Sequence, residues 1–514
     1  MADIMILGEN CAFSTDSEKT GLNNNVLVVG PSGSGKTMSI AEPLLLKTFS
    51  RSLVVSVTKR RLVEQYTPLL KSRGYQVLDL DFVDTSRGNV GYDPLQYVTS
   101  YQEINFLAES VVNADPRKLL SHADPYWTQA ATSVLCAEIA YTLMKKGPYA
   151  TFTDVLDLHG RLRITEDMLS GIETTVDEEF RALEETDPDC YAIKCWKSLV
   201  QLPYRTAGCV FSELNVTLDT LFSEELRRVM SHPRKIDLEH IGQEKTVLFV
   251  TTSPVNPSLN CFINMFYGQV FKQLFEFAEV QPNGILPVPV HVLCDDFATG
   301  CPINGFAQYI SIFREKGISV TLLLQSESQL ASMYSNEDAT TIINNCDTSL
   351  FMGCPNDLMT AKHISIRLDL PLGDVLSFPI GKEIVFRRGQ RPIITDRYDI
   401  QKDEVYQITL REYRASHYKP QHIKRCDSMS PSVHQRHKSF VEEMRENMDE
   451  VTFETHSEQD LYDYFSVNKE DLQGLREFAA KGSPTEETSL DEDLQDEVEK
   501  RFQELFGSGK RKHD

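Results

Sequence analysis

The sequence predicts an α/β protein built around a mostly parallel sheet. Short apolar runs alternate with segments that have the apolar spacing of helices, as in strands joined by helical crossovers. The apolar runs are continuous rather than alternating, which indicates strands covered on both faces. Residues 97–202, in the first half of the chain, lack strand signals. These three observations together predict a sheet domain interrupted by a helical insertion.

The first group of elements comes before the insertion. We expect strands at residues 25–29, 52–57 and 75–80, and helices at 38–45 and 59–73. The strands are rich in β-branched residues, and the helices have the length of βαβ crossovers.

The second group of elements follows an inserted domain that we expect to be all-α, because residues 97–202 show only long amphipathic patterns. The sheet pattern then returns. The expected strands are 246–251, 288–294, 318–324 and 348–352, with helices at 259–278 and 306–316 and a terminal hairpin at 381–397.

A glycine-rich loop joins the first expected strand to the helix after it. Residues 30–37 have the G-x-x-x-x-G-K-[ST] pattern of a phosphate-binding loop, in the strand-loop-helix context that the pattern requires. Backbone N–H groups and the helix dipole would surround phosphate oxygens, Lys36 would bridge the β- and γ-phosphates, and the Thr37 hydroxyl would hold Mg²⁺. We therefore predict a site for ATP and Mg²⁺ made of Gly30, Pro31, Ser32, Gly33, Ser34, Gly35, Lys36 and Thr37.

Two acidic residues follow the expected strand 288–294, at the sheet edge where open α/β folds bind ligands. We expect Asp295 to contact the Mg²⁺ shell and Asp296 to orient or deprotonate the attacking water. Gln325 ends the next strand and could reach the γ-phosphate or the water; a buried glutamine bonded to backbone is the alternative. Arg314 could be a surface cation or, in a ring, an arginine finger for the neighbouring subunit.

The charge of the chain is unevenly distributed. The formal net charge is −23, and residues 441–514 contain 22 acidic against 9 basic residues, so the acidic average does not exclude an acidic ligand elsewhere. Residues 411–438 contain seven Lys and Arg and four His against two acids. This basic run could contact nucleic acid or anionic lipid, or it could be a solvated linker.

Other features indicate a cytoplasmic protein. The eleven cysteines include no C-x-x-C pair, which favours reduced thiols over a disulfide framework or a zinc site. The N-terminus lacks the features of a signal peptide, and no apolar run approaches the length of a membrane span.

The chain accordingly divides into five expected parts. Residues 1–97 and 203–410 form the two parts of a P-loop NTPase domain, and 98–202 form the all-α insertion. Residues 411–440 form a basic linker, and 441–514 form an acidic tail that we expect to be partly disordered.

Five segments resemble TraG/TraD type coupling proteins, the P-loop ATPases of conjugative DNA transfer in type IV secretion. The similarity runs in the same order over roughly residues 21–400, which makes it specific. The segments are residues 21–37, Asp124-Pro125-Tyr126-Trp127, Thr153-Asp154-Val155-Leu156, 313–326 and 342–348.

The resemblance implies a RecA-like motor domain with an inserted all-α domain, assembled as a homo-hexameric ring. Such rings use ATP to deliver DNA, with its attached relaxase, to the membrane components of a secretion channel. On the matching positions, Arg314 takes the arginine-finger role and Gln325 the γ-phosphate sensor role. The insertion would face the cytoplasm and meet the relaxase complex, and the protein would be cytoplasmic, peripheral at the inner membrane through a partner.

Three departures from the family pattern occur. Asp296 stands where the family usually has Glu, and residues 57–60 replace the usual Asp-Pro-Lys-Gly, so that only Lys59 carries over. Most members begin with a transmembrane anchor, whereas only 29 residues precede Gly30 here. We therefore expect no transmembrane segment in this chain, and either a separate membrane partner or an anchorless branch of the family.

Two other functions stay open at this point. One is a P-loop motor for another cargo, such as packaged DNA or secreted protein. The other is a non-catalytic docking adaptor that holds nucleotide while the helical insertion and acidic tail bind partners.

Overall fold

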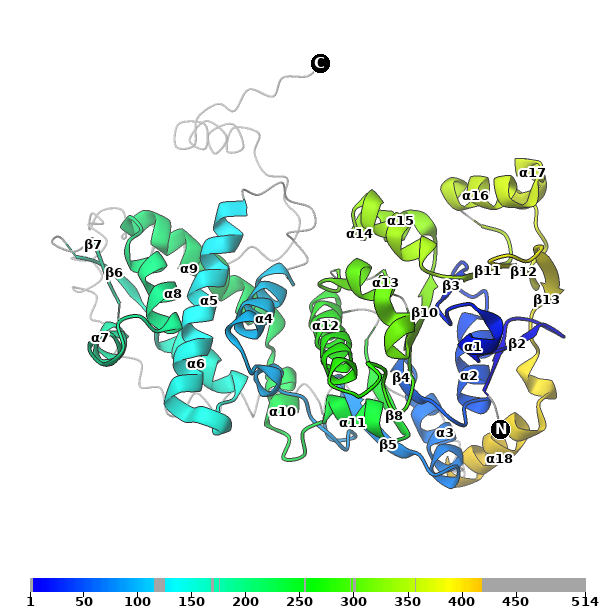
Figure 1. Cartoon of the computed structure of the whole chain (residues 1–514), viewed down its shortest axis with the longest axis horizontal. Coiled ribbons are helices and arrows are strands. Elements are labelled where there is room, and N and C mark those ends of the chain that lie inside the picture. The colour runs from blue at the N-terminus through cyan, green and yellow to red at the C-terminus, as the bar shows by residue number, and fades with distance from the viewer. Residues whose placement is uncertain are drawn as a thin grey trace, which may run out of the picture. The chain divides into compact units, whose positions relative to one another are not determined.

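A computed structural model describes residues 3–417, except 115–124, 168–170, 175, 254–255, 296, 299–301 and 356 (Figure 1). Residues 418–514, which include most of the predicted basic linker and the whole predicted acidic tail, lie outside the described residues.

A nine-stranded sheet forms the centre of the α/β core, in the order β13-β12-β11-β3-β10-β9-β4-β8-β5. Seven strands are parallel, and all seven were expected from the sequence. They are β3 (Val26–Val29), β4 (Ser52–Val57), β5 (Gln76–Asp81), β8 (Thr246–Thr251), β9 (Val290–Cys294), β10 (Ile318–Leu324) and β11 (Thr348–Met352). The predicted hairpin, β12 (Lys382–Arg387) and β13 (Ile393–Asp396), adds two antiparallel strands at one edge.

The parallel strands are mostly apolar at positions on both sides because helices cover both faces of the sheet. Every residue of β3, β4, β8, β9, β10 and β11 is buried. Alternate residues enter two separate cores: Leu27 and Val54 belong to one, and Val28 and Val55 to the other. Continuous apolar runs therefore reflect burial on both sides.

One face of the sheet packs against α2 (Glu42–Leu46), α3 (Arg60–Ser72) and α18 (Glu404–His417) (Figure 1). The opposite face packs against a larger group. It comprises α11 (Leu238–Gln243), α12 (Pro257–Glu279), α13 (Phe306–Lys316), α14 (Glu327–Met333), α15 (Asn336–Asn344), α16 (Leu358–Leu368) and α17 (Leu372–Leu376).

The insertion lies in the chain between β5 and β8 and is helical apart from one antiparallel hairpin. Its helices are α4 (Tyr101–Asn113), α5 (Pro125–Lys146), α6 (Phe152–Arg161), α7 (Asp177–Thr186), α8 (Tyr191–Val200), α9 (Tyr204–Leu221) and α10 (Glu224–Ser231), and the hairpin is β6 (Ile164–Asp167) with β7 (Gly171–Thr174). Because α9 contacts α5 and α10 contacts α6, we propose that the insertion ends after α10 rather than at residue 202.

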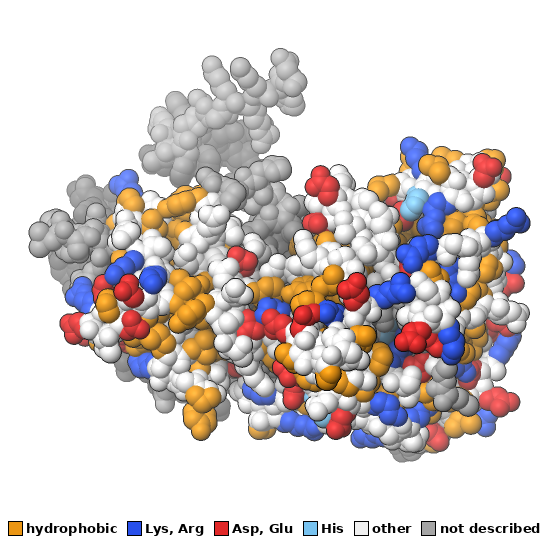
Figure 2. Space-filling model, in the orientation of Figure 1, with side chains coloured by type: hydrophobic (Ala, Val, Ile, Leu, Met, Phe, Trp, Pro, Cys, Tyr) orange, Lys and Arg blue, Asp and Glu red, His pale blue; other side chains and the backbone are white. Residues whose placement is uncertain are grey.

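The N-terminal segment and the connections contribute shorter elements. They are β1 (Ile4–Ile6), β2 (Ala12–Ser14), α1 (Ser17–Thr20), and the 3₁₀ turns Pro94–Tyr97, Gly147–Tyr149 and Ile400–Lys402. None of the described helices is long and apolar enough to cross a membrane. Acidic and basic side chains both occur across the face shown in Figure 2.

A buried carboxylate fixes the helix that follows the glycine-rich loop. Thr37–Ala41 form a π-helical turn that continues into α2, and Glu42, which is 0% exposed, begins α2. Its carboxylate accepts hydrogen bonds from the Arg61 guanidinium and the Tyr66 hydroxyl, each at 2.6 Å. Since a buried charge is stable only when its partners are in place, this contact sets the position of α2 on α3.

Replacing Glu42 should destabilise the sheet domain. Glu42→Ala leaves the Tyr66 hydroxyl and the Arg61 guanidinium without their buried acceptor, and we expect a loss of about 3 kcal/mol in the free energy of unfolding. Urea denaturation measures this, with the exposed Glu404→Ala as the matched control. Equal unfolding midpoints for the two variants would contradict the structural role.

Candidate nucleotide-binding site

The glycine-rich loop leaves the carboxyl end of β3 in the interior of the sheet. Val29, the last residue of β3, lies level with Leu324 on β10 and with Phe351 on β11. The Gly30 N–H then donates to the Leu324 carbonyl at 3.1 Å. The loop therefore begins beside the residue that ends β10, at the edge where open α/β sheets bind ligands.

Three glycines give the loop a shape that other residues would not allow. Gly33 has φ +80° and Gly35 has φ +92°, which are left-handed conformations that favour glycine. A Cβ on Gly30 would lie 2.7 Å from the Ser34 hydroxyl oxygen. That hydroxyl is itself buried and has no hydrogen-bond partner among the described residues. The fold of the loop thus fits a backbone cradle for phosphate.

The predicted lysine lies within the loop. Lys36 is 9% exposed, and its ammonium donates to the carbonyl oxygens of Gly30 at 2.5 Å and Pro31 at 3.3 Å. Thr37, the next residue, is half-buried and starts the π-helical turn. The loop carbonyls are acceptors that phosphate oxygens can replace, so Lys36 is placed to bind a phosphate held in the loop.

Two further predicted residues lie at the same sheet edge. Gln325 follows β10, and Asp295 follows β9, the strand on the far side of β10 from β3. Neighbouring strands are about 4.8 Å apart, so β9 lies about 10 Å from β3, with β10 between them. Cys294 pairs with Leu322, so Asp295 leaves its strand slightly before the level of Gln325. Gln325 is exposed and Asp295 half-buried, so the alternative of a buried glutamine is wrong.

The other two predicted catalytic residues stay predictions. Asp296 lies outside the described residues. Arg314 lies in the last turn of α13 and is exposed, just before Gly317 ends that helix with φ +74°. An exposed arginine at a helix end is suited to contact another molecule.

Residues 57–60, which replace the Asp-Pro-Lys-Gly pattern, place an arginine next to two carboxylates of β5. Lys59 is exposed at the start of α3. The Arg60 guanidinium binds Asp79 at 2.8 Å and Asp81 at 3.3 Å, and both carboxylates lie on β5. Arg60 therefore joins the carboxyl end of β4 to the edge strand of the sheet.

Two of the segments that resemble coupling proteins meet in the structure. The Asn23 N–H donates to the Asp347 carboxylate at 2.7 Å, and the Asn25 side-chain amide donates to the Asn345 carbonyl at 3.0 Å. The Asn25 side-chain oxygen also accepts from Val320 N–H on β10 at 3.0 Å. Together these bonds hold the entrance to β3 between β10 and β11.

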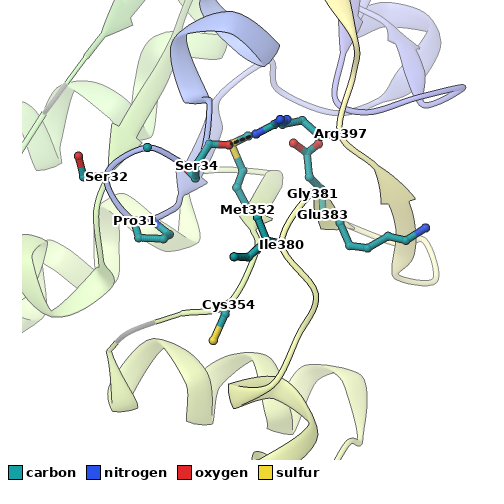
Figure 3. A pocket seen from close by; sticks show the side chains of 12 residues that line it. Pro31, Ser32, Ser34, Met352, Cys354, Ile380, Gly381, Glu383 and Arg397 are labelled. Atoms are coloured by element: carbon teal, nitrogen blue, oxygen red, sulfur yellow. Dashed lines mark hydrogen bonds between the residues drawn. The ribbon is translucent and has the colours of Figure 1, made fainter.

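A cavity of about 260 Å³ lies beside the loop, and the sequence analysis did not predict it. Figure 3 shows residues from four segments around it. One wall is loop residues 31–34, and the others are residues 352–354 after β11, residues 380–383 at the start of β12, and Arg397 after β13. No local sequence pattern indicates that the terminal hairpin returns to the loop, because the contact depends on which strands pair.

Two charged residues that line this cavity, Glu383 and Arg397, were not predicted from the sequence. Glu383 is 1% exposed, and neither carboxyl oxygen has a hydrogen-bond partner among the described residues. Burial raises the pKa of Glu383 to about 7, against a smaller lowering by the Arg397 guanidinium. Arg397 donates to the Ser34 carbonyl at 2.8 Å and lies against Gly35, where a Cβ would be 2.8 Å from its Nη1.

Glu383 should make stability depend on pH. The raised pKa means that the folded chain keeps this proton up to about pH 7, whereas the ordinary value is 4.5, so stability falls as pH rises through that window. Glu383→Gln carries no charge at any pH. The variant should gain about 2 kcal/mol over the wild type at about pH 8, and little at about pH 5.

Urea midpoints of both proteins across this range measure the effect, and the exposed Glu404→Gln serves as control. Burial raises and the Arg397 charge lowers the pKa of Glu383, and burial together with the Glu383 charge raises the pKa of the Cys11 thiol. Neither Arg397 nor Cys11 is changed in these variants. A stability difference that stays constant with pH would contradict the assignment.

Comparisons with known proteins show which family this chain belongs to and which solved structures it resembles. A family model for type IV secretory system conjugative DNA transfer matches residues 5–369. A comparison with curated proteins found no match. Among solved structures, the unbound monoclinic form of the bacterial conjugative coupling protein TrwBdeltaN70 is 14% identical, with TM-score 0.56, over 77% of this chain and 89% of that one.

Two nucleotide complexes of the plasmid coupling protein TrwB are also similar. The complex with ADP and Mg²⁺ is 16% identical (TM-score 0.54; 73% of this chain and 84% of that one), and the complex with a non-hydrolysable ATP analogue is 17% identical (0.54; 73% and 85%). The similarity in structure shows the RecA-like fold of the P-loop core. Since the family model covers well over half of the chain, the chain belongs to the family of conjugative DNA-transfer proteins of type IV secretion systems.

Proposed function

We propose that this protein is an ATP-hydrolysing coupling protein that recruits DNA with its attached relaxase and translocates it to a type IV secretion channel. The observation that carries the proposal is the loop itself: Lys36 lies inside a glycine cradle whose edge also presents Gln325 and Asp295. The family acts in conjugative DNA transfer, which supports DNA as the substrate that such a site would move.

ATP and Mg²⁺ are the proposed cofactors, and the TrwB complexes with ADP and Mg²⁺ and with an ATP analogue support them. The loop N–H groups would hold the phosphates, and Lys36 would bridge the β- and γ-phosphates. The Thr37 hydroxyl and Asp295 would hold the metal ion, which needs few protein ligands and neutralises charge on the phosphates.

Hydrolysis would divide between two subunits. Within one chain, Gln325 would contact the γ-phosphate or the water, and Asp296 would orient that water. Arg314, exposed at the end of α13, would reach the nucleotide of a neighbouring subunit in a homo-hexameric ring. We propose that the ring works in the cytoplasm and reaches the inner membrane through components of the secretion system.

A nucleotide-holding adaptor is the second candidate, and Asp296 is the observation that favours it. The side chain is one methylene shorter than the Glu usual in the family, which could leave the attacking water poorly positioned. Such a protein would bind ATP and dock partners without turnover.

Steady-state ATP hydrolysis, measured with and without single- and double-stranded DNA, tests the motor against the adaptor. We expect turnover that DNA stimulates. Lys36→Ala should abolish it by removing the phosphate cation, and Arg314→Ala should lower kcat by about 1,000-fold with nucleotide binding retained. Arg205→Ala, an exposed helix arginine, is the matched control and should behave as wild type.

Mixing the two inactive variants tests whether Arg314 acts on a neighbour. Each mixed interface can pair a Lys36 site from the Arg314→Ala chain with an Arg314 from the Lys36→Ala chain, so some activity should return. No recovery would argue against the trans role. ATP binding without turnover under every condition would favour the adaptor.

A further inference from the structure

The cavity is bounded on one side by loop residues 31–34, the loop in which the proposed function places the phosphates. Met352 ends β11, and its Cβ is 3.0 Å from the Cβ that Gly30 lacks. Glu383 lies opposite Met352 in the β11–β12 pairing. The cavity therefore borders the loop directly, and Glu383 is one of its lining residues (Figure 3).

Glu383 is an unusual residue for such a wall. A buried carboxyl group loses its water and normally recovers hydrogen bonds from the protein. Here both oxygens lack a partner among the described residues. The neighbouring cations are engaged elsewhere, since Arg397 donates to the Ser34 carbonyl and Lys382 pairs with Asp396 at 2.7 Å. Among the described residues, the structure thus keeps a buried carboxyl group without a partner on the wall of this cavity.

The chemistry of the carboxyl group indicates which partner fits. With a pKa of about 7, Glu383 is present in both protonation states near neutral pH. A carboxylate only accepts hydrogen bonds, whereas a carboxylic acid also donates one. A sugar hydroxyl can donate a hydrogen bond to the carboxylate and accept one from the carboxylic acid. The Watson–Crick N–H groups of guanine are donors only. Adenine offers both a donor, N6–H, and an acceptor, N1, but the edges of both bases lie farther from the phosphates than the sugar does.

We propose that the cavity receives the ribose of the bound nucleotide and that Glu383 binds its hydroxyl groups, which makes Glu383 a specificity residue for ribonucleotides. This inference rests on the proposed function, because the sugar reaches the cavity only if the loop holds the phosphates. The exposed Arg397 side chain forms the neighbouring wall and links it to the loop.

Calorimetric binding of three ligands tests the proposal: ADP, 2′,3′-dideoxy-ADP and pyrophosphate, each with Mg²⁺. The wild type should bind ADP about tenfold more tightly than the dideoxy form, as expected for hydrogen bonds to a charged group. Glu383→Ala should lose this preference and bind pyrophosphate as the wild type does. Glu383→Gln, which keeps the size of the side chain, should lose part of the preference, and Glu404→Ala should lose none.

Each contrary result has a separate meaning. A wild type that binds ADP and dideoxy-ADP equally, or a Glu383→Ala variant that weakens pyrophosphate as much as ADP, would overturn the sugar assignment. A fourth titration, with GDP, covers the base. If Glu383→Ala keeps the preference for ADP over dideoxy-ADP but loses a preference between ADP and GDP, the residue binds the base and the sugar assignment is overturned. A wild type that binds neither ADP nor pyrophosphate would overturn the proposed function itself.

Discussion

The parallel pairing of β3 with β10 and β11 is the constraint on which the rest of the site depends. It brings Val29, Leu324 and Phe351 to one level, so the loop, Gln325 and the wall of the adjoining cavity begin at one edge. The pairing is stable because both faces of these strands are buried, and Asn23 and Asn25 bond to the neighbouring segments just before β3 starts. A one-residue slip in this register would exchange the two cores and separate the loop from Gln325.

The sequence could predict the strands and the glycine-rich loop, because each of these is indicated by a pattern of neighbouring residues. The run 318–324 is largely apolar and buried at every position because helices cover it on both sides. Residues 30–37 carry a glycine-rich motif, and Gly33 and Gly35 adopt the left-handed backbone conformations that it allows. The end that we propose for the insertion, after α10, has no local pattern that marks it, because an amphipathic helix such as α9 shows which face is buried but not which domain buries it. Glu383 and Arg397 could not be predicted either. Their place beside the loop results from β12 pairing with β11, and such long-range pairing leaves no mark in the hairpin's own sequence.

The segment after β13 connects the loop to the last described helix. Arg397 bonds to the Ser34 carbonyl, and Lys47, just after α2, pairs with Asp403 at 2.5 Å, immediately before α18. Glu42 holds α2 to α3 on the same face of the sheet. The glycine-rich loop is therefore held by buried strands and by the Arg397 contact, and the segment that carries Arg397 is itself tied to the end of α2 by the Lys47–Asp403 ion pair.

The central claim is that Lys36 exchanges loop carbonyls for phosphate when nucleotide binds. A crystal structure of the chain with Mg²⁺ and a non-hydrolysable ATP analogue tests it most directly. We expect the phosphates within residues 30–37, with the Lys36 ammonium moved from the Gly30 carbonyl onto the β- and γ-phosphate oxygens. An analogue bound elsewhere, with Lys36 still on the Gly30 carbonyl, would contradict the account.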